Sequence, residues 1–365
     1  MTQKRTLPPL AAQVNLTLSP LCGVRRSCIM IRMDPVTHLS AGAVVYHVVR
    51  RRLPAARFLV VFCLFLAILP DADILFFRSD PSFYLRYHRG FSHSILFVLL
   101  ASPLLGWCYA RLTNESSRKK LIALAAGLLS LHIYQDLITS YGTQIFAPFT
   151  DARLGMDAVF IIDPLYTGLT LLGLGYLLFR KQHRQIVGLL LLSWILAYPL
   201  LCSGLRTVAE TQYRQSLMEQ NAPYDCLTVT TDALSPLYWK AILVNNGQYA
   251  LESVRMGERD ESTPDFKYRR PSGELLDTLR NAAPFLDTYF WFTAFPFYTE
   301  TQRPDGGRDL EFGDLRFQSP GPIISSLFSN GRTPFALTVQ LNAQGQVQQF
   351  VFHRGSKTFA QSLVE

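Results

Sequence analysis

Residues Ile186–Cys202 read IVGLLLLSWILAYPLLC, and they form the cleanest membrane-spanning run in the chain. Crossing a bilayer takes about 20 mostly apolar helical residues. Five further apolar runs precede this one, and each becomes long enough only by including polar residues at one end. They cover residues 41–49, 58–69, 95–109, 121–131 and 165–179. The pattern predicts an all-α multi-pass membrane bundle, with a soluble all-α core as the alternative.

Composition and charge divide the chain into two unlike parts. The 365 residues are 49% apolar and 17% charged, which excludes a disordered chain. Residues 1–203 carry 20 of the 35 Lys and Arg and 9 of the 27 Asp and Glu, whereas residues 204–365 carry the remaining 15 and 18. We therefore expect a membrane domain over 33–203 and a soluble domain over 204–365.

Eleven basic residues of the first part fall in three clusters, near residues 50–57, 111–120 and 180–184. If each cluster is a cytoplasmic turn, the positive-inside rule orients six helices without conflict. The loops 73–91 and 139–163 and the whole second half then face the other side of the membrane. The six expected helices cover residues 35–49, 56–72, 92–110, 119–138, 164–179 and 185–203.

The first 32 residues do not fit this topology. They are basic and weakly apolar, and a short run at 16–22 lacks a convincing cleavage site for a signal peptide. Met30 and Met33 stand just before the pattern begins. We expect residues 1–32 to be a wrongly assigned or disordered extension, with translation starting at Met30 or Met33.

Ionisable side chains occur where the sequence otherwise suits lipid. Such groups are costly in a membrane segment and mark a functional site by default. On the expected topology they all lie at one end of their helices or in the adjoining loops. In chain order they are Asp34, His38, Asp71, Asp73, His88, His93, His132, Asp136, Asp157 and Asp163. His47, at the opposite end of the first helix, is interpreted as structural.

Imidazole and carboxylate groups are ligands that hold Zn²⁺ or Mn²⁺ and leave coordination positions open. His132 and Asp136 are four residues apart, so one helical face carries both. His88 and His93 can converge where an extended segment turns into a helix. We expect a metal site built from seven residues, namely His38, Asp71, Asp73, His88, His93, His132 and Asp136. A proton or ion path is the alternative, although a transporter would show repeated halves.

Several sequence blocks are similar to one protein family. They resemble, in the family's order over residues 34–200, the YdjM-like family of bacterial inner-membrane proteins, described as metal-dependent hydrolases. The blocks are DPVTH (34–38), LPDAD (69–73), YHRGFSHS (87–94), HIYQDLITSYGT (132–143), APF (147–149) and IIDPLYT (161–167). The motifs PLYW (236–239), WFTAFP (291–296) and DLRF (314–317) resemble the C-terminal part of longer members. The resemblance implies a bacterial inner membrane location. The placement of the basic residues then puts the site and the C-terminal domain on the periplasmic side.

A more distant likeness is to zinc-dependent phospholipase C and fungal single-strand nucleases. Their ligand order of early His, Asp, His pair and HxxxD helix matches His38, Asp71 or Asp73, His88 with His93, and His132 with Asp136. The N-terminal Trp ligand and the later His-rich blocks of those enzymes are missing here. The likeness therefore implies one or two metal ions, zinc before manganese, and not a full three-metal site.

Together these features predict a metal-dependent hydrolase that uses metal-activated water on a phosphoester or related ester of a lipid-like substrate. Asp73, Arg89 and Asp163 are the candidate catalytic residues, and Arg89 is expected to hold an anionic group. The partners expected are the bilayer and an amphiphilic or lipid-linked substrate, and no nucleic acid. The alternative is a membrane scaffold with a structural metal, whose C-terminal domain binds envelope partners.

The second half reads as a small soluble α+β domain. A helix is expected over 204–220, followed by strands over 224–230, 238–245, 247–252, 333–341 and 346–353. Residues 342–345 suit the turn of a hairpin between the last two strands. The aromatic residues between Tyr289 and Tyr298 are expected to form the core of the sheet, with a lipid- or glycan-facing surface as the alternative.

Overall fold

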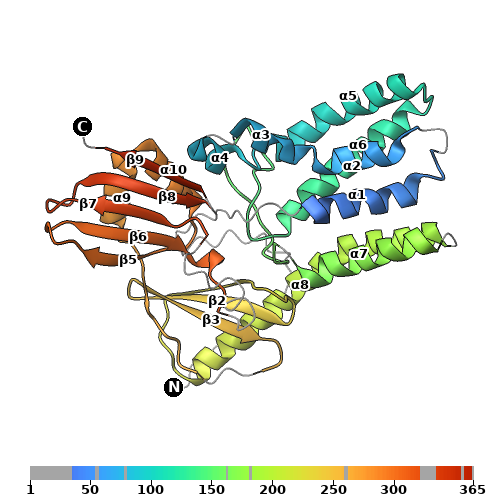
Figure 1. Cartoon of the computed structure of the whole chain (residues 1–365). Coiled ribbons are helices and arrows are strands. Elements are labelled where there is room, and N and C mark those ends of the chain that lie inside the picture. Colours follow the sequence, from blue (N-terminus) through green and yellow to red (C-terminus); the bar gives the residue numbers. More distant parts are fainter. Residues whose placement is uncertain are drawn as a thin grey trace, which may run out of the picture.

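The computed structural model describes residues 35–53, 57–77, 80–161, 163–180, 183–258, 262–320, 334–354 and 357–363. The expectation for residues 1–32 and the candidate Asp34 lie outside this part of the chain. A helical bundle is followed by an antiparallel sheet domain (Figure 1). The helical elements are α1 Pro35–Val49, α2 Leu59–Ile68, η1 Pro70–Asp73, α3 Ile74–Phe77, α4 Pro81–Tyr87, η2 Phe91–His93, α5 Ile95–Thr113, α6 Arg118–Leu137, α7 Pro164–Phe179 and α8 Arg184–Glu219.

The described helices include two that are long and apolar enough to cross a membrane, α5 and α8. A third span results if α2 and the segment Pro70–Phe76 are taken together across their 56° bend. Helices α1, α2, α5, α6, α7 and α8 lie where the six membrane helices were expected, but the count of six spans is not confirmed. Helices α1, α2 and α7 are short, with only 15, 10 and 16 residues, and α6 has 20 residues but is too polar to count as a span.

Local sequence explains where the helices around the site begin and end. Pro70 follows α2 directly, and its ring prevents an unbroken helix from continuing into η1. Asp80, Ser94 and Asp163 are the N-caps of α4, α5 and α7, and their side chains accept backbone N–H groups of the first turn. These breaks and caps place short polar segments at one end of the bundle.

Glycine allows a close approach of two helix backbones in the bundle. A Cβ on Gly106 of α5 would lie 2.6 Å from Ile122 Cα of α6. Only a residue without a side chain permits this approach of the two backbones. Helices α5 and α6 therefore pack as a tight antiparallel pair, and α6 carries His132 and Asp136.

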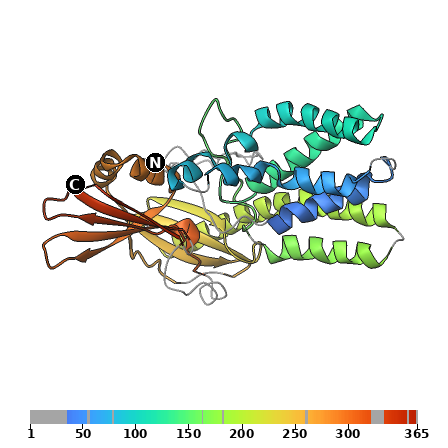
Figure 2. The ribbon, with the colours of Figure 1, turned by 45° about the horizontal axis from the view of Figure 1, so that its top comes forward.

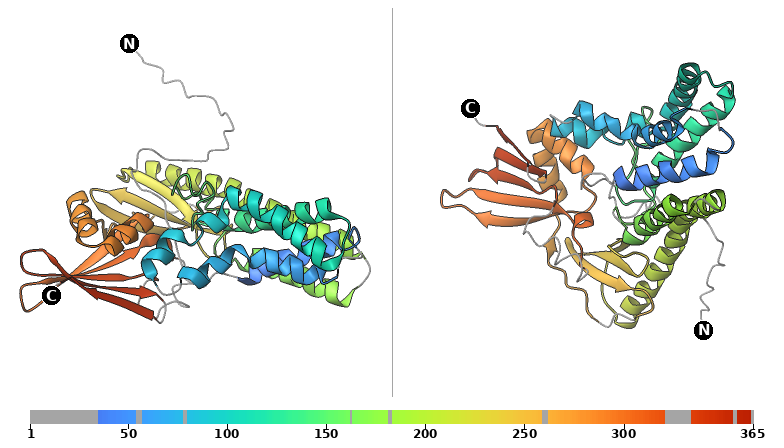
Figure 3. Two further views of the ribbon diagram at one scale, coloured as in Figure 1. Left: turned by 90° about the horizontal axis from the view of Figure 1, so that it is seen from above. Right: turned by 45° about the vertical axis from the view of Figure 1, so that its right-hand side comes forward.

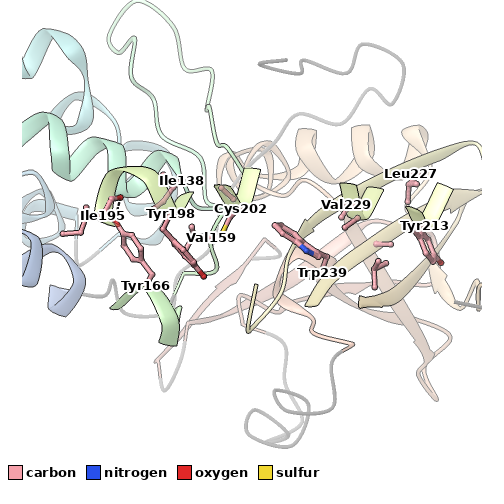
Figure 4. Close-up of a cluster of buried hydrophobic side chains, with 14 of the residues drawn as sticks. Ile138, Val159, Tyr166, Ile195, Tyr198, Cys202, Tyr213, Leu227, Val229 and Trp239 are labelled. Carbon is pink, nitrogen blue, oxygen red and sulfur yellow. Dashed lines mark hydrogen bonds between the residues drawn. The ribbon is translucent and has the colours of Figure 1, made fainter. Parts of the chain in front are cut away.

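Helix α8 joins the two parts of the protein. It runs unbroken for 36 residues, through Pro199 and past the expected domain boundary at 203/204. Figure 4 shows buried side chains along it that form one continuous cluster, from Ile195 and Tyr198 in the bundle to Val229 and Trp239 in the sheet. The composition changes at residue 204, but helix α8 and the hydrophobic core continue across this position.

The sheet domain, residues 226–363, contains nine strands in the described part of the chain, each antiparallel to the next in chain order. They are β1 Cys226–Thr231, β2 Tyr238–Asn245, β3 Gln248–Arg255, β4 Tyr268–Arg269, β5 Pro296–Gln302, β6 Arg308–Asp314, β7 Leu337–Leu341, β8 Val347–Arg354 and β9 Lys357–Ser362. The five expected strands are present, and the hairpin turn is confirmed by Asn342 N donating to Gln346 O at 2.9 Å. Strands β4, β5, β6 and β9 were missed because their alternation is weak.

Two helices, α9 Gly273–Ala282 and α10 Pro284–Phe292, pack on the sheet (Figure 2). Tyr289, Phe290, Trp291 and Phe292 of α10 are buried, so the expected aromatic core is confirmed. The outer side of α10 contacts α4, where the Arg86 guanidinium lies 4.2 Å from the Trp291 ring. Figure 3 shows this seam between the bundle and the sheet domain from two sides.

Candidate metal centre

Four side chains converge where η1, η2 and α6 meet. One ligand atom each of Asp71, His93, His132 and Asp136 lies within 4.8 Å of every other. His93 Nε2 is 3.1 Å from Asp71 Oδ1, 3.1 Å from Asp136 Oδ2 and 3.1 Å from His132 Nε2. His132 Nε2 is 3.3 Å from Asp71 Oδ1 and 3.5 Å from Asp136 Oδ2. We call these four residues the metal group.

The spacing of these atoms suits a small divalent ion. Ligand atoms about 2.0–2.1 Å from a tetrahedral Zn²⁺ are about 3.3 Å apart. The five distances given above, between 3.1 and 3.5 Å, bracket that value. Five of the six separations within the metal group therefore suit a four-coordinate ion, and the sixth, between Asp71 and Asp136, is within 4.8 Å.

Helix α6 contributes two members of the metal group through its i, i+4 spacing. His132 and Asp136 occupy the last two turns of α6 and are buried. His132 Nδ1 lies 2.7 Å from the carbonyl oxygen of Ala67 on α2. Because a carbonyl only accepts, Nδ1 carries the hydrogen, and the lone pair of Nε2 faces the metal group.

A second chain of hydrogen bonds orients His93. Ser92 Oγ donates to Asp73 Oδ2 at 2.9 Å, so the serine accepts from His93 Nδ1 at 2.9 Å. His93 Nε2 is then also unprotonated and directed at the metal group. This outer support of ligating histidines is typical of metal sites.

One member of the metal group is less enclosed than the rest. The side chains of His93, His132 and Asp136 are at most 1% exposed, and that of Asp71 is 10% exposed. The second oxygen of Asp71, Oδ2, is buried and has no hydrogen-bond partner among the described residues. A buried carboxylate oxygen without a partner is costly, and a cation bound beside it would satisfy it.

Arg89 contacts a member of the metal group, Asp136, and does not stand free to hold an anionic group as expected. Its Nη2 is 2.8 Å from Asp136 Oδ1, and its Nη1 donates to Asp136 O and Thr139 Oγ1. The guanidinium carbon lies 3.9 Å from the centre of the Tyr141 ring. Arg89 is 5% exposed and therefore supports the Asp136 carboxylate directly.

The other three expected ligands lie close by but outside the metal group. Asp73 Oδ1 accepts from His88 Nδ1 at 2.8 Å, and burial lowers the pKa of His88 and keeps this ring neutral. His38 stacks on His132 with ring centres 4.0 Å apart, and its Nε2 is 3.6 Å from Asp136 Oδ1. Asp73, His88 and His38 thus surround the four clustered residues.

The last two acidic candidates serve other contacts. Asp163 accepts the Tyr166 N–H at 2.8 Å as the cap of α7 and lies 3.3 Å from the Tyr198 hydroxyl. Asp157 lies 3.4 Å from Arg206 Nη1. Neither carboxylate is a member of the metal group.

Sequence reasoning did not single out four residues that shape the centre. These are Ser92, Gln135, Thr139 and Tyr141. All four stand inside the YHRGFSHS and HIYQDLITSYGT blocks, at 87–94 and 132–143. Their position within these blocks was the available signal.

The segment that carries the centre is similar to a known family. Residues 33–209 match the model of the family described as YdjM inner membrane protein, which confirms the resemblance and includes the whole metal group. Over 95 residues the chain is 28% identical to a Bacillus subtilis (strain 168) protein described as "Uncharacterized protein YfhP". That match covers 26% of this chain and only 29% of the relative. No solved structure matches the chain significantly.

Proposed function

We propose, from the match of residues 33–209 to the YdjM inner membrane protein family, that this membrane protein is a metal-dependent hydrolase. Its substrate would be a phosphoester or related ester of a lipid-like molecule. The observation that carries the proposal is the metal group, in which two imidazoles and two carboxylates meet at the spacing of a metal site. Zinc suits this donor set best, and manganese is the second choice.

A divalent ion held by Asp71, His93, His132 and Asp136 would supply Lewis acidity and lower the pKa of a bound water. The residues around it would hold these four in place. Asp73 orients His93 through Ser92 and also holds His88. We assign Asp73 and Arg89 as positioning residues, and Asp163 as the residue that sets the start of α7.

The proposed site opens on the Asp71 side, where apolar side chains are exposed. Leu75 and Phe76 of α3 are 74% and 81% exposed, and Phe149 is 82% exposed. Such large apolar side chains beside a membrane bundle suit the headgroup and acyl boundary of a bilayer. This location supports an amphiphilic substrate.

The proposed orientation rests on charge. Arg50, Arg51, Arg111, Arg118 and Arg184 lie near the ends of helices that point away from the metal group (Figure 1). By the positive-inside rule that end would face the cytoplasm, and the metal group and the sheet domain would face the periplasm.

A fusion of alkaline phosphatase after Glu365 tests this orientation. We expect the fused enzyme to be active, and an inactive fusion would mean that the orientation is the reverse.

One observation favours a second candidate, a membrane scaffold with a structural metal. Structural zinc sites are closed by four protein ligands, whereas catalytic sites keep a position for water. The metal group already offers four ligands. A catalytic role requires one of them, with Asp71 the most exposed, to share its position with water.

The test is metal analysis of the detergent-purified protein with hydrolysis assays alongside. Wild type, His132→Ala and Asp71→Asn are compared with His47→Ala, whose histidine lies at the far end of α1. We expect bound metal and turnover of phosphodiester or lipid phosphoester substrates in wild type and His47→Ala only. Metal retained by His132→Ala would contradict the site. Metal that is bound without turnover across a broad substrate panel would favour the scaffold.

A further inference from the structure

A cavity of about 450 Å³ lies at the seam between the bundle and the sheet domain. Arg86 of α4 and Asp151 line it from the bundle side. Tyr249 of β3, Arg270, Arg280 of α9 and Trp291 of α10 line it from the sheet domain. None of these residues belongs to the metal group, so the cavity is a separate feature.

The cavity contains hydrogen-bond donors without partners. The Tyr249 side chain is fully buried, and its hydroxyl has no hydrogen-bond partner in the described part of the chain. Burial also raises the pKa of Tyr249, so the hydroxyl stays protonated and can donate. Arg280 Nε is likewise buried without a partner among the residues described, while its Nη2 donates to Phe290 O at 3.2 Å and holds the side chain in place.

The charges in the cavity leave two guanidinium groups available. Arg86 is paired with Asp151, with Nη2 2.8 Å from Oδ2. Within the described ranges, neither Arg270 nor Arg280 forms an ion pair with a carboxylate, and the remaining acid of the lining, Asp287, is exposed. A buried or half-buried arginine without an acidic partner is costly unless an anion binds to it.

We propose that this cavity binds an oxyanion of the phosphate type between Arg270, Arg280 and the Tyr249 hydroxyl. Guanidinium groups match phosphate oxygens in a planar, two-pronged geometry, and a phenol adds a third donor. The anion would come from free phosphate or from a lipid headgroup that reaches the seam. The proposal does not depend on the hydrolase activity or on a metal.

The experiment titrates inorganic phosphate into the detergent-purified full chain by calorimetry at low ionic strength. Arg270→Gln and Tyr249→Phe are compared with wild type, and Arg269→Gln is the matched control. Arg269 is the neighbour of Arg270 on β4, but it pairs with Glu300 at 3.1 Å and does not line the cavity. Each variant changes a single side chain outside the metal group. Any phosphate binding at the metal group would therefore be the same in all four proteins.

We expect saturable binding that weakens with salt, a dissociation constant raised about tenfold or more by Arg270→Gln, and a smaller rise in Tyr249→Phe. Arg269→Gln should bind as wild type does. Equal affinity in all four proteins, or no phosphate binding in wild type, would overturn the proposal. Competition with short-chain phosphatidylglycerol identifies the source of the anion. If this lipid displaces phosphate at lower concentration than phosphate itself does, the anion is a lipid headgroup. If the two compete equally, the anion is free phosphate.

Discussion

His93 and His132 bring their Nε2 atoms to 3.1 Å of each other although they lie 39 positions apart in the sequence. Each ring donates its Nδ1 hydrogen elsewhere, His93 to Ser92 and His132 to Ala67. Two lone pairs therefore face each other beside the carboxylates of Asp71 and Asp136. A cation bound between the two nitrogens and the two carboxylates would stabilise this arrangement.

Removing the outer support of His93 should weaken metal binding. Ser92→Ala deletes the hydroxyl that links His93 Nδ1 to Asp73, which frees the ring to rotate. We expect the metal affinity to fall about 10- to 100-fold, as measured by competition with a chromophoric chelator. Ser102→Ala, in the middle of α5, is the control. An unchanged affinity in Ser92→Ala would show that the serine does not orient the ligand.

Arg89 and Arg86 should differ sharply in their effect on stability. Arg89→Met leaves the buried Asp136 carboxylate without its guanidinium, and breaking a buried pair in this way costs about 3–5 kcal/mol. Arg86→Met breaks the pair with Asp151, whose side chains are 35% and 47% exposed, and such pairs contribute about 0–1 kcal/mol. Thermal unfolding in detergent measures both. Equal shifts in the two variants would contradict the assignment of Arg89.

Chelation should destabilise the bundle in wild type only. An ion that binds only the folded state stabilises it by about 4 kcal/mol at a concentration one thousand times its dissociation constant. We therefore expect EDTA to lower the midpoint of thermal unfolding and added zinc to restore it. In His132→Ala the midpoint should be low at the start and unaffected by EDTA. If neither EDTA nor zinc changes the midpoint of thermal unfolding of wild type, metal binding would be refuted.

Lys240 makes the stability of the sheet domain depend on pH. Burial lowers the pKa of Lys240 to about 8, and Nζ donates to the carbonyl oxygens of Arg316 and Gln318. The unfolded chain, with a lysine pKa near 10.5, binds more protons between these values, so stability rises as pH increases from 8 to 10.5. The total rise is about 3 kcal/mol. It should disappear in Lys240→Met and persist in Lys267→Met, an exposed control, when the unfolding midpoint is followed against pH.

Two glycines provide a matched test of helix packing. Gly106→Ala places a methyl group 2.6 Å from Ile122 Cα and must push α5 from α6, which costs about 1–3 kcal/mol. Gly127→Ala lies on α6 with nothing within 4 Å of the new Cβ, so it should stabilise the helix by up to about 1 kcal/mol. Opposite shifts of the unfolding midpoint are expected. A destabilising Gly127→Ala would mean that α6 packs differently.

The sequence by itself determined which residues could meet. Helix positions followed from apolar runs and from breaks such as Pro70, where proline lacks the backbone N–H that a continuing helix would use. The same breaks assigned Asp71, His93, His132 and Asp136 to one end of the bundle. The spacing of His132 and Asp136 also predicted that they share a face, since helical periodicity is local.

Only the tertiary structure decided how seven candidate ligands divide. Four face one another, while Asp73 and His88 hold each other, and His38 stacks on His132. That division depends on which nitrogen of each histidine ring forms a hydrogen bond outside the metal group. His132 Nδ1, for example, donates to the carbonyl oxygen of Ala67, 65 positions earlier in the sequence. Helices were expected on both sides of residue 204, but their continuity as the single helix α8 was not, because a change in composition does not show where a helix ends. Contacts between segments far apart in the sequence determine the directions of these side chains, and a local sequence pattern does not show such contacts.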